Sequence, residues 1–586
     1  MPNRMVRIAA GCSVDVTSAL PQMARYGEVD YLVLDYLMEH GLAKMAAARA
    51  ADPEAGYAAG FLGPDILGEL GRLLANGTRI IASAGGLNPL RCAELFRRQA
   101  AEIGLSPRIA VVHGDDVLDL AGPEQVDMFT GERLPDRLVS SNVYLGAAPI
   151  AAVLAGEPDI VITGRVVDSA LSLGPLLHEF GWPLDDYDLM AAGSLVGHLL
   201  ECGAQPSGGI HTDWREIDFA DTSFPIAEVH DDGGIVITKA PGTGGRISFG
   251  TIAEQLTYEI SDPQRYFLPD VTLDSSRVTL EEVGPDRIRI SGAKGYPPTS
   301  TYKVCSIEHV GWRGVLANVI AGEDADEKAR KTMDAVIARA EIINERNGWG
   351  PFTSTGTEVI GSGDSLGAHA RPVNPQEVVY RLVADHPNRE AVDSLLRVHG
   401  ATYVSMSPGT CYLSAEARPL MRVWSFLLDK DQVDPLLTVD GEATTIKVPR
   451  HDGFHDGLVR TNTPLTTLEA PDGVAVPLER LAYTRSGDKG DMANVSVVAR
   501  DPRFLPYLAH ALTTESVKTW FRHVFSDPAT ARVDRFEMPG IGALNFLLHH
   551  GLDGGAVSSR RFDDMGKTYG QQLTGFPVRV PSVLIE

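Results

Sequence analysis

The first 230 residues alternate between short apolar runs and longer stretches in which apolar residues recur every three to four positions. Such runs are typical of buried strands, and the longer stretches are typical of amphipathic helices. Asn88 and Pro89 form a favoured helix start, and Gly104 ends the same helix. The alternation predicts an α/β portion with a largely parallel sheet. Its five strands are expected at residues 6–10, 31–34, 79–83, 108–112 and 159–163.

The pattern changes after residue 230. Residues 270–304 are strand-like and rich in turns, and residues 327–346 form a clear amphipathic helix. Glycine, proline, aspartate and threonine then interrupt the pattern ahead of the last hundred residues. We therefore expect an N-terminal domain over residues 1–460, a linker over 461–476 and a C-terminal domain over 477–586. The N-terminal domain is expected to combine an α/β portion (1–230) with an α+β portion (231–460).

The C-terminal stretch predicts a two-layer α+β unit with the element order β-β-α-β-α-β. One helix is expected at residues 502–524 and a second, short one at 543–550. The expected strands are residues 478–483, 495–499, 532–538 and 577–580.

Composition narrows the class of protein. The formal net charge of −25 repels phosphate backbones, so nucleic acid is not an expected partner. No apolar run approaches the roughly 18 residues of a membrane span, and the first residues lead directly into a strand, so we expect a cytoplasmic protein without membrane contact. The five cysteines lie 80 or more residues apart, which predicts no disulfide framework.

Polar residues follow several of the predicted parallel strands. Ligands bind outside the carboxyl ends of the strands in such sheets, and a helix N-terminus there favours an anion. Helix capping is an alternative role for Asn88, Asp168 and Ser169, but Arg165 does not fit a cap. The substrate-binding candidates at these strand ends are Asn88, Asp116, Arg165, Asp168 and Ser169.

A helical segment at residues 197–205 carries His198 and Glu201, three positions apart and therefore on one face. The pair has the residue types of a general base or of two metal ligands, and a hydrogen-bonded core histidine is the alternative. Gln205 ends the segment as a further binding candidate. No cofactor or metal site is predicted, and a divalent metal requirement stays open.

A glycine-rich loop follows the strand-like residues 234–238. Its backbone N–H groups and its lysine have the composition of a cradle for a phosphate or carboxylate, although such glycines also serve simple turns. The binding candidates here are Lys239, Gly242, Thr243, Gly244 and Gly245. The sequence contains neither a P-loop nor a dinucleotide fingerprint, so no nucleotide cofactor is predicted.

Residues 485–494, R-S-G-D-K-G-D-M-A-N, place several polar head groups between two predicted strands. A solvated turn is one interpretation. The number of different head groups favours a ligand site, completed between the two domains. The catalytic candidates in this stretch are Arg485, Asp488, Lys489, Asp491 and Asn494, and His198 and Glu201 join them from the N-terminal domain.

Several segments resemble the acyclic terpene utilisation protein A (AtuA-like) family over nearly the whole chain. They include A-G-G-L-N-P at 84–89, I-V-I-T-G-R-V-V-D-S-A-L at 160–171, G-H-L-L-E-C-G-A-Q at 197–205, T-K-A-P-G-T-G-G at 238–245 and the 485–494 stretch. The resemblance implies a large N-terminal domain, a C-terminal ferredoxin-like domain and a place in the breakdown of acyclic terpenes or branched acids through acyl-CoA intermediates. Residues 11–15 depart from the family's usual turn, which points to a different substrate if that turn shapes the pocket.

The combined expectation is an enzyme of acyclic-terpene or branched-acid catabolism, a lyase of the hydratase or dehydratase type or one that cleaves a carbon–carbon bond. Its substrate would be a small carboxylic acid or an acyl-CoA thioester. Such chemistry needs cationic or N–H donors near a developing oxyanion, together with an acid–base pair. The alternative is a non-catalytic scaffold that binds an acyl-CoA or a carboxylase subunit. A homo-oligomer is expected in either case.

Overall fold

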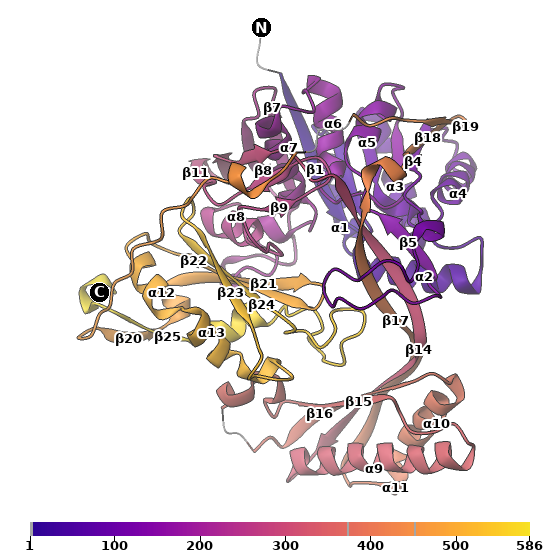
Figure 1. Ribbon diagram of the computed structural model, residues 1–586, viewed down its shortest axis with the longest axis vertical. Helices are drawn as coiled ribbons and strands as arrows, with labels where there is room; N and C mark the ends of the chain where they lie inside the picture. The colour runs from indigo at the N-terminus through magenta and orange to yellow at the C-terminus, as the bar shows by residue number, and fades with distance from the viewer. Residues whose placement is uncertain (1–3, 372–373, 450–452, 586) are drawn as a thin grey trace.

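The computed structural model describes residues 4–371, 374–449 and 453–585. Its largest element is an eleven-stranded mixed sheet with the order β11-β12-β8-β7-β1-β2-β3-β6-β4-β18-β19 (Figure 1). The five predicted strands form its centre, and all neighbours among them are parallel. They are β1 (Met5–Cys12), β2 (Tyr31–Asp35), β3 (Arg79–Ala82), β4 (Ile109–His113) and β6 (Ile160–Thr163).

Antiparallel strands extend this centre on both sides, so the expectation of a largely parallel sheet is confirmed only for the middle of the sheet. One flank pairs with β1 through β7 and the other pairs with β4 through β18. The flanking strands are β7 (Pro225–His230), β8 (Ile235–Lys239), β11 (Thr279–Gly284), β12 (Arg287–Ser291), β18 (Leu436–Val439) and β19 (Glu442–Thr445).

Helices cover both faces of the sheet, which explains why its central strands are continuous apolar runs. In β1, Ile8 packs into the core on one face and Ala9 into the core on the other. The helices on the Ala9 side are α1 (Val16–Tyr26), α2 (Glu39–Ala51), α3 (Pro64–Ala75) and α4 (Pro89–Glu102), and those on the Ile8 side are α5 (Ala148–Leu154), α6 (Ala170–Phe180) and α7 (Tyr187–Leu200).

Two unusually long strands, β14 (Thr301–Ala321) and β17 (Thr410–Asp429), form a ribbon that leaves the large sheet (Figure 1). Near the large sheet β14 also pairs with β5 (Ser140–Val143). At its far end it pairs with β16 (Glu377–His386), which pairs with β15 (Ser354–Ile360). The far end is covered by α9 (Ala325–Arg346), α10 (Arg389–Gly400) and α11 (Thr402–Ser405), and α9 confirms the helix predicted at 327–346.

The C-terminal residues form a four-stranded antiparallel sheet with the order β21-β22-β24-β23. Its strands are β21 (Ala482–Lys489), β22 (Met492–Ala499), β23 (Val533–Met538) and β24 (Ala543–Leu548). The helices α12 (Leu505–Ala511), α13 (Thr514–Trp520) and α14 (Tyr569–Leu573) accompany it, and β20 (Val474–Pro477) pairs with β25 (Pro577–Val580).

Three local predictions in this region were wrong. The short helix expected at 543–550 is the strand β24, whose six residues are all buried, and a fully buried apolar run does not distinguish strand from helix. The single helix expected at 502–524 is two helices, because Thr513 caps the start of α13. The polar stretch 485–494 is mostly strand, since β21 and β22 pair up to Lys489 and Met492 and only Gly490 and Asp491 turn the chain.

The C-terminal sheet docks onto the large domain. One of its faces packs on its own helices, and the other lies against α8 (Phe249–Leu256) and the residues that follow it. The Thr257 and Ser496 hydroxyls are 2.6 Å apart across this interface, and the Asn545 amide donates to the Ile260 and Ser261 carbonyls at 2.7 Å. No helix in the described ranges is long and apolar enough to cross a membrane.

His399 makes the far end of the ribbon sensitive to acid. Its side chain is fully buried on α10, and neither ring nitrogen has a hydrogen-bond partner among the residues that the structure describes. Burial lowers the pKa of His399 to about 4. Between pH 6.5 and 4 the unfolded chain therefore binds more protons than the folded one, and about 3 kcal/mol of stability is lost as the pH falls through this window.

We predict that His399→Leu removes this acid-dependent loss, because leucine has no proton to bind. The measurement is the free energy of unfolding in denaturant at pH 7.5 and at pH 4. The wild-type protein should lose more stability between the two values than the variant does. Equal losses in both proteins would contradict the assignment.

Candidate functional site

Arg165 lies directly after β6, at the carboxyl edge of the parallel strands. Its side chain is 3% exposed, and its guanidinium centre lies 4.0 Å from the centre of the Tyr144 ring. It donates to the Leu37 carbonyl and forms an ion pair with Asp168 at 3.3 Å. Its Nε has no hydrogen-bond partner within the described part of the chain. Asp115 accepts the Arg165 backbone N–H at 2.8 Å, which fixes the turn that positions the guanidinium.

Glu39, Tyr144 and Lys303 surround the guanidinium and come from three separate elements, α2, the end of β5 and β14. The Tyr144 hydroxyl donates to Glu39 at 2.6 Å, and the Lys303 ammonium lies 3.4 Å from the same carboxylate. Burial opposes ionisation of Glu39, but Lys303, Arg165 and the Tyr144 hydroxyl outweigh it and lower the pKa of this carboxyl. Glu39 is therefore an anion that links the two cations.

His198 and Glu201 lie on one face at the end of α7, as predicted from their spacing. The His198 Nε2 lies 3.0 Å from the Gln255 carbonyl oxygen, so Nε2 carries a proton, and Nδ1 lies 3.2 Å from the Glu201 carboxylate. Burial, followed by the charges of Asp35, Glu201 and Glu39, raises the pKa of Asp168 despite the opposing effect of Arg165. Glu201 therefore lies within electrostatic reach of Asp168.

The C-terminal domain adds charged groups to the same region. The Lys567 ammonium donates to Glu259 at 2.9 Å and to the Tyr258 hydroxyl, and it lies 3.7 Å from Asp488. Burial and the charge of Glu259 raise the pKa of Asp488 to about 7, against the opposing charge of Lys567. Asp488 can therefore exist as acid and as carboxylate near neutral pH.

Lys489, at the end of β21, is the cation in this region without a partner. Among the described residues it makes no hydrogen bond or ion pair, and its nearest aromatic neighbour is the Tyr266 ring, with the centroid 5.6 Å from the ammonium. Burial disfavours its charge, but Tyr266, Glu259, Glu201 and Glu39 together raise the pKa of Lys489. These four electrostatic neighbours all belong to the N-terminal domain, whereas Lys489 itself belongs to the C-terminal domain.

Partial exposure combined with strong desolvation is typical of charged side chains that lie in a recess. Asp168 and Glu39 keep 34% and 39% of their side-chain surface accessible, yet burial is the largest influence on the pKa of each. A charged group on a convex surface would not be desolvated in this way. We call this region the interdomain recess, and its residues are Glu39, Arg165, Asp168, Glu201, Glu259, Asp488 and Lys489.

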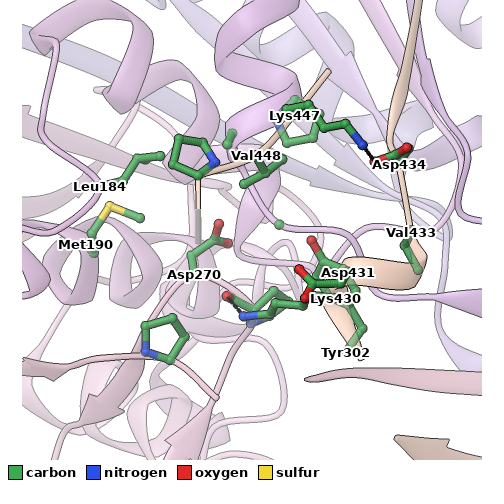
Figure 2. A pocket seen from close by; sticks show the side chains of 16 residues that line it. Leu184, Met190, Asp270, Tyr302, Lys430, Asp431, Val433, Asp434, Lys447 and Val448 are labelled. Atoms are coloured by element: carbon green, nitrogen blue, oxygen red, sulfur yellow. Dashed lines mark hydrogen bonds and ion pairs between the residues drawn. The ribbon is translucent and has the colours of Figure 1, made fainter. Parts of the chain in front are cut away.

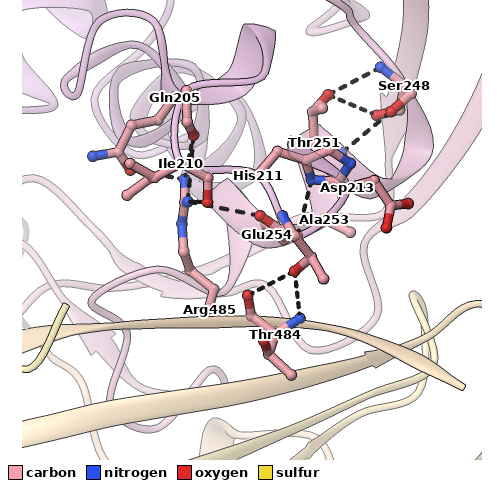
Figure 3. Close-up of polar contacts among 12 residues, drawn as sticks. Gln205, Ile210, His211, Asp213, Ser248, Thr251, Ala253, Glu254, Thr484 and Arg485 are labelled. Atoms are coloured by element: carbon pink, nitrogen blue, oxygen red, sulfur yellow. Dashed lines mark hydrogen bonds and ion pairs between the residues drawn. The ribbon is translucent and has the colours of Figure 1, made fainter. Parts of the chain in front are cut away.

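Arg485, on β21, reaches across the domain interface, and we call its contacts there the Arg485 strut (Figure 3). Its guanidinium donates to the Ile210 carbonyl at 2.7 Å and to the Gln205 side chain at 2.9 Å, and it lies 3.6 Å from Glu254, whose side chain is 1% exposed. The other Glu254 oxygen lies 2.9 Å from the His211 ring. The structure thus places Arg485 and Gln205 in contact with each other and with protein groups of the interface.

Asn494 also acts across the interface. Its side-chain oxygen accepts the Glu259 backbone N–H at 2.9 Å, and its amide donates to the Thr257 carbonyl at 3.1 Å. Glu259 has a φ of 53°, a left-handed conformation that is rare for a residue with a side chain. Asn494 therefore helps to hold Glu259 in the conformation that directs it to Lys567.

Other candidates make contacts outside the recess. Asp491 lies 2.8 Å from the His550 ring and accepts the Gly554 N–H at 2.7 Å. The Asn88 amide lies 3.3 Å from the Glu54 and Ala55 carbonyls and makes no cap bond, although Asn88 occupies the cap position of α4. Asp116 accepts the Leu118 N–H at 3.1 Å. Ser169 precedes α6, and its buried hydroxyl has no partner among the described residues.

The glycine-rich loop is closed by its own contacts. The Lys239 ammonium donates to the Thr243 carbonyl at 2.7 Å and lies 3.4 Å from Asp286. Gly242 and Gly245 have φ values of 75° and 71°, and the Gly244 N–H donates to Asp221 at 3.1 Å. These glycines serve the left-handed turns of the loop.

Sequence reasoning missed five residues that contact or line the recess, namely Glu39, Tyr144, Glu259, Lys303 and Lys567. Glu39 lies five residues beyond the end of the strand predicted at 31–34, and that position was a usable signal. Lys303 and Lys567 had no local signal, because the long β14 strand and the C-terminal fold bring them in from distant parts of the chain. In the described residues, no group of three or more His, Cys, Asp or Glu side chains is arranged to hold a metal ion.

A separate cavity of about 140 Å³ lies beside the start of α5 (Figure 2). Its walls include Asp270, Tyr302 and Lys430, and it shares no residue with the interdomain recess. Gly146 and Tyr302 line it, whereas their near neighbours Tyr144 and Lys303 contact the recess residues. The two sites therefore lie on either side of the same chain segments.

Comparison with known proteins identifies the family. A search of curated proteins found no match. The family model described as acyclic terpene utilisation family protein AtuA matches residues 5–439, and the model of the AtuA ferredoxin-like domain matches residues 476–579. The first match alone covers most of the chain and includes Arg165, Asp168 and Glu201, while the second includes Asp488 and Lys489. The chain belongs to the acyclic terpene utilisation (AtuA) family and carries its ferredoxin-like domain at the C-terminus.

Proposed function

We propose that this protein is an enzyme of acyclic-terpene or branched-acid catabolism that adds or removes water next to the carbonyl of an acyl-CoA thioester or free acid. The observation that carries the proposal is the Lys489 ammonium, which has no ion-pair or hydrogen-bond partner among the described residues and lies near acids of the other domain. A desolvated cation without a protein partner is a group that an anionic ligand or a developing oxyanion can use. Membership of the family supports the pathway.

Arg165 and Lys489 would stabilise the negative charge that develops on the carbonyl oxygen. Both are desolvated, and in such surroundings a cation acts more strongly on a nearby charge than it does in water. The Arg165 Nε donor also has no hydrogen-bond partner among the residues that the structure describes. We assign Lys489 to the C-terminal half and Arg165 to the N-terminal half of a site that requires both domains.

Asp168 and Asp488 would supply the acid–base pair. In dehydration, the Asp168 carboxylate removes the proton next to the carbonyl, and the electron pair moves onto the carbonyl oxygen. The electron pair then moves back from the carbonyl oxygen and forms the carbon–carbon double bond, which expels the β-hydroxyl. The β-hydroxyl takes a proton from the Asp488 carboxylic acid and leaves as water. Hydration is the reverse sequence. Raised pKa values suit both roles, because they strengthen the base and keep the acid protonated.

Arg485, Gln205 and Asn494 would act as positioning residues, because their contacts are with protein groups of the domain interface. His198 would orient Glu201, which lies 3.2 Å from its ring.

The test of this proposal is turnover of a panel of unsaturated and 3-hydroxy branched acyl-CoA thioesters and their free acids, incubated with the purified full chain. Mass spectrometry would read the gain or loss of water and the loss of acetate, with and without a divalent metal. Loss or gain of water supports the proposal, and loss of acetate would instead identify carbon–carbon cleavage. If thioesters bind but the whole panel returns unchanged, the scaffold role is favoured and the enzymatic proposal fails.

The pH dependence of the reaction should report Asp488. We predict that the rate of dehydration falls above about pH 7, because the carboxyl must be protonated to release water. Asp488→Asn cannot titrate, so its residual rate should lack this fall. The measurement is kcat against pH from 5.5 to 9 for both proteins. A fall at the same pH in the variant would assign the titration to another group.

A further inference from the structure

The cavity beside α5 has the composition of a binding site that the proposed reaction does not use (Figure 2). Its walls come from distant parts of the chain, which the fold brings together around a partly open volume of about 140 Å³. One water position needs roughly 10–15 Å³, so the cavity has room for about ten water positions or a small organic molecule. Its apolar walls include Pro149, Leu184, Met190, Pro298, Val433 and Val448.

Asp270 provides a hydrogen-bond acceptor in this cavity. Both of its carboxylate oxygens lie 3.0 Å from the single Ala147 N–H, which is the only hydrogen bond that Asp270 makes within the described residues. A carboxylate has about four lone-pair positions, so most of its accepting capacity is unused. Burial raises the pKa of Asp270 to about 6, with partial opposition from Ala147 and Lys430.

Tyr302 provides a donor. Its side chain is 5% exposed and lines the cavity, and its hydroxyl has no hydrogen bond to any residue that the structure describes. Burial and the charge of Asp270 raise the pKa of Tyr302, so the hydroxyl keeps its proton. The influence of Asp270 also shows that the two groups are within electrostatic reach of each other.

The charges around the cavity narrow the class of ligand. Lys447 also lines the cavity and pairs with Asp434, so the Asp270 carboxylate is the group that would repel a carboxylate or phosphate. An ammonium group would compete with Lys430 for Asp270, because the charge of Lys430 already lowers the pKa of that carboxyl. Lys430 also donates to the Pro269 and Thr299 carbonyls at 2.7 Å. A neutral polar group is left as the best match.

We propose that this cavity binds a short aliphatic alcohol, whose hydroxyl donates to Asp270 and accepts from Tyr302 while its chain lies against the apolar walls. A hydroxyl is complementary to this pair because it is both a donor and an acceptor. The volume fits a chain of about four to six carbons. The site is distinct from the interdomain recess and does not depend on the proposed reaction.

The test is saturation-transfer NMR on the full chain with 1-pentanol, pentylammonium and pentanoate as probes. We expect 1-pentanol to bind with a Kd on the order of 1 mM, as suits a ligand of few atoms, and to bind more tightly than the two charged probes. Tyr302→Phe should weaken binding of 1-pentanol by about five- to tenfold, because it removes one hydrogen bond and keeps the ring. Val448→Phe should abolish binding by filling the cavity.

Tyr507→Phe is the matched control, since Tyr507 lies on the C-terminal domain and does not line the cavity. Thermal unfolding of each variant checks that it folds. No transfer to 1-pentanol would show that the cavity holds only water and would overturn the proposal. Equal binding by wild type, Tyr302→Phe and Val448→Phe would place the alcohol elsewhere, and tighter binding of pentylammonium would overturn the hydroxyl assignment.

Discussion

Lys489→Met is expected to lower kcat/KM for the acyl thioester that the wild-type protein turns over by about a hundred- to a thousandfold. This is the range seen when a preorganised group that stabilises an oxyanion is removed. Methionine keeps most of the length of the lysine side chain and removes its charge. Because Lys489 makes no hydrogen bond or ion pair with described residues, the fold should be preserved. The measurement is turnover by mass spectrometry together with thermal unfolding.

Lys331→Met is the control for this experiment, because Lys331 lies exposed on α9, far along the ribbon from the recess. It should leave turnover unchanged. Lys489→Arg keeps a cation and should recover part of the rate. If Lys489→Met turned over the thioester at the wild-type rate, the recess would lose the group on which the functional proposal rests.

Arg485→Ala is expected to destabilise the protein by about 3–5 kcal/mol, the usual cost of removing one partner from a buried ion pair. The substitution leaves Glu254, which is 1% exposed, without its guanidinium neighbour, and it leaves the Ile210 carbonyl and the Gln205 side chain without their donor. The measurement is the free energy of unfolding in denaturant.

Arg503→Ala is the matched control, since Arg503 is 66% exposed and pairs with Asp501 at 2.7 Å on the surface. Exposed pairs of this kind contribute about 0–1 kcal/mol. Arg485→Lys keeps the charge but not the planar fork, so it should fall between the wild type and the alanine variant. Unfolding of Arg485→Ala at the wild-type midpoint would show that the strut does not hold the domains together.

The sequence predicted the central strands well because their signal is local. Each of the five parallel strands is an apolar run followed by a turn, and both features can be read within about ten residues. Arg165 and Asp168 were found for the same reason, since they follow directly on β6. The antiparallel pairing of the flanks was not predicted, because β7 and β18 take their place through pairing with strands that are distant in the sequence.

The partners of the site residues could not be predicted because they depend on tertiary contacts. Lys567 reaches Glu259 from 308 positions further along the chain, and Lys303 reaches Glu39 from 264 positions further along. The spacing of residues 485–494 suggested one cluster of head groups. In the structure these residues lie apart: Arg485 contacts the domain interface, Lys489 lies in the interdomain recess, and Asp491 lies in the turn between β21 and β22. A one-dimensional pattern does not contain this separation.

The long ribbon of β14 and β17 makes the chain modular. The two strands of the ribbon are antiparallel, and the Ala321 N–H donates to the Gly409 carbonyl at 3.1 Å. The chain between these two residues therefore starts and ends at neighbouring positions. A short turn can therefore replace residues 322–408 without lengthening the path of the backbone. Lys303, at the opposite end of β14, would keep its place beside Glu39. The ribbon is thus a splice point for a smaller protein, which would lack the contacts that Glu358, His369 and Arg381 make with the C-terminal domain.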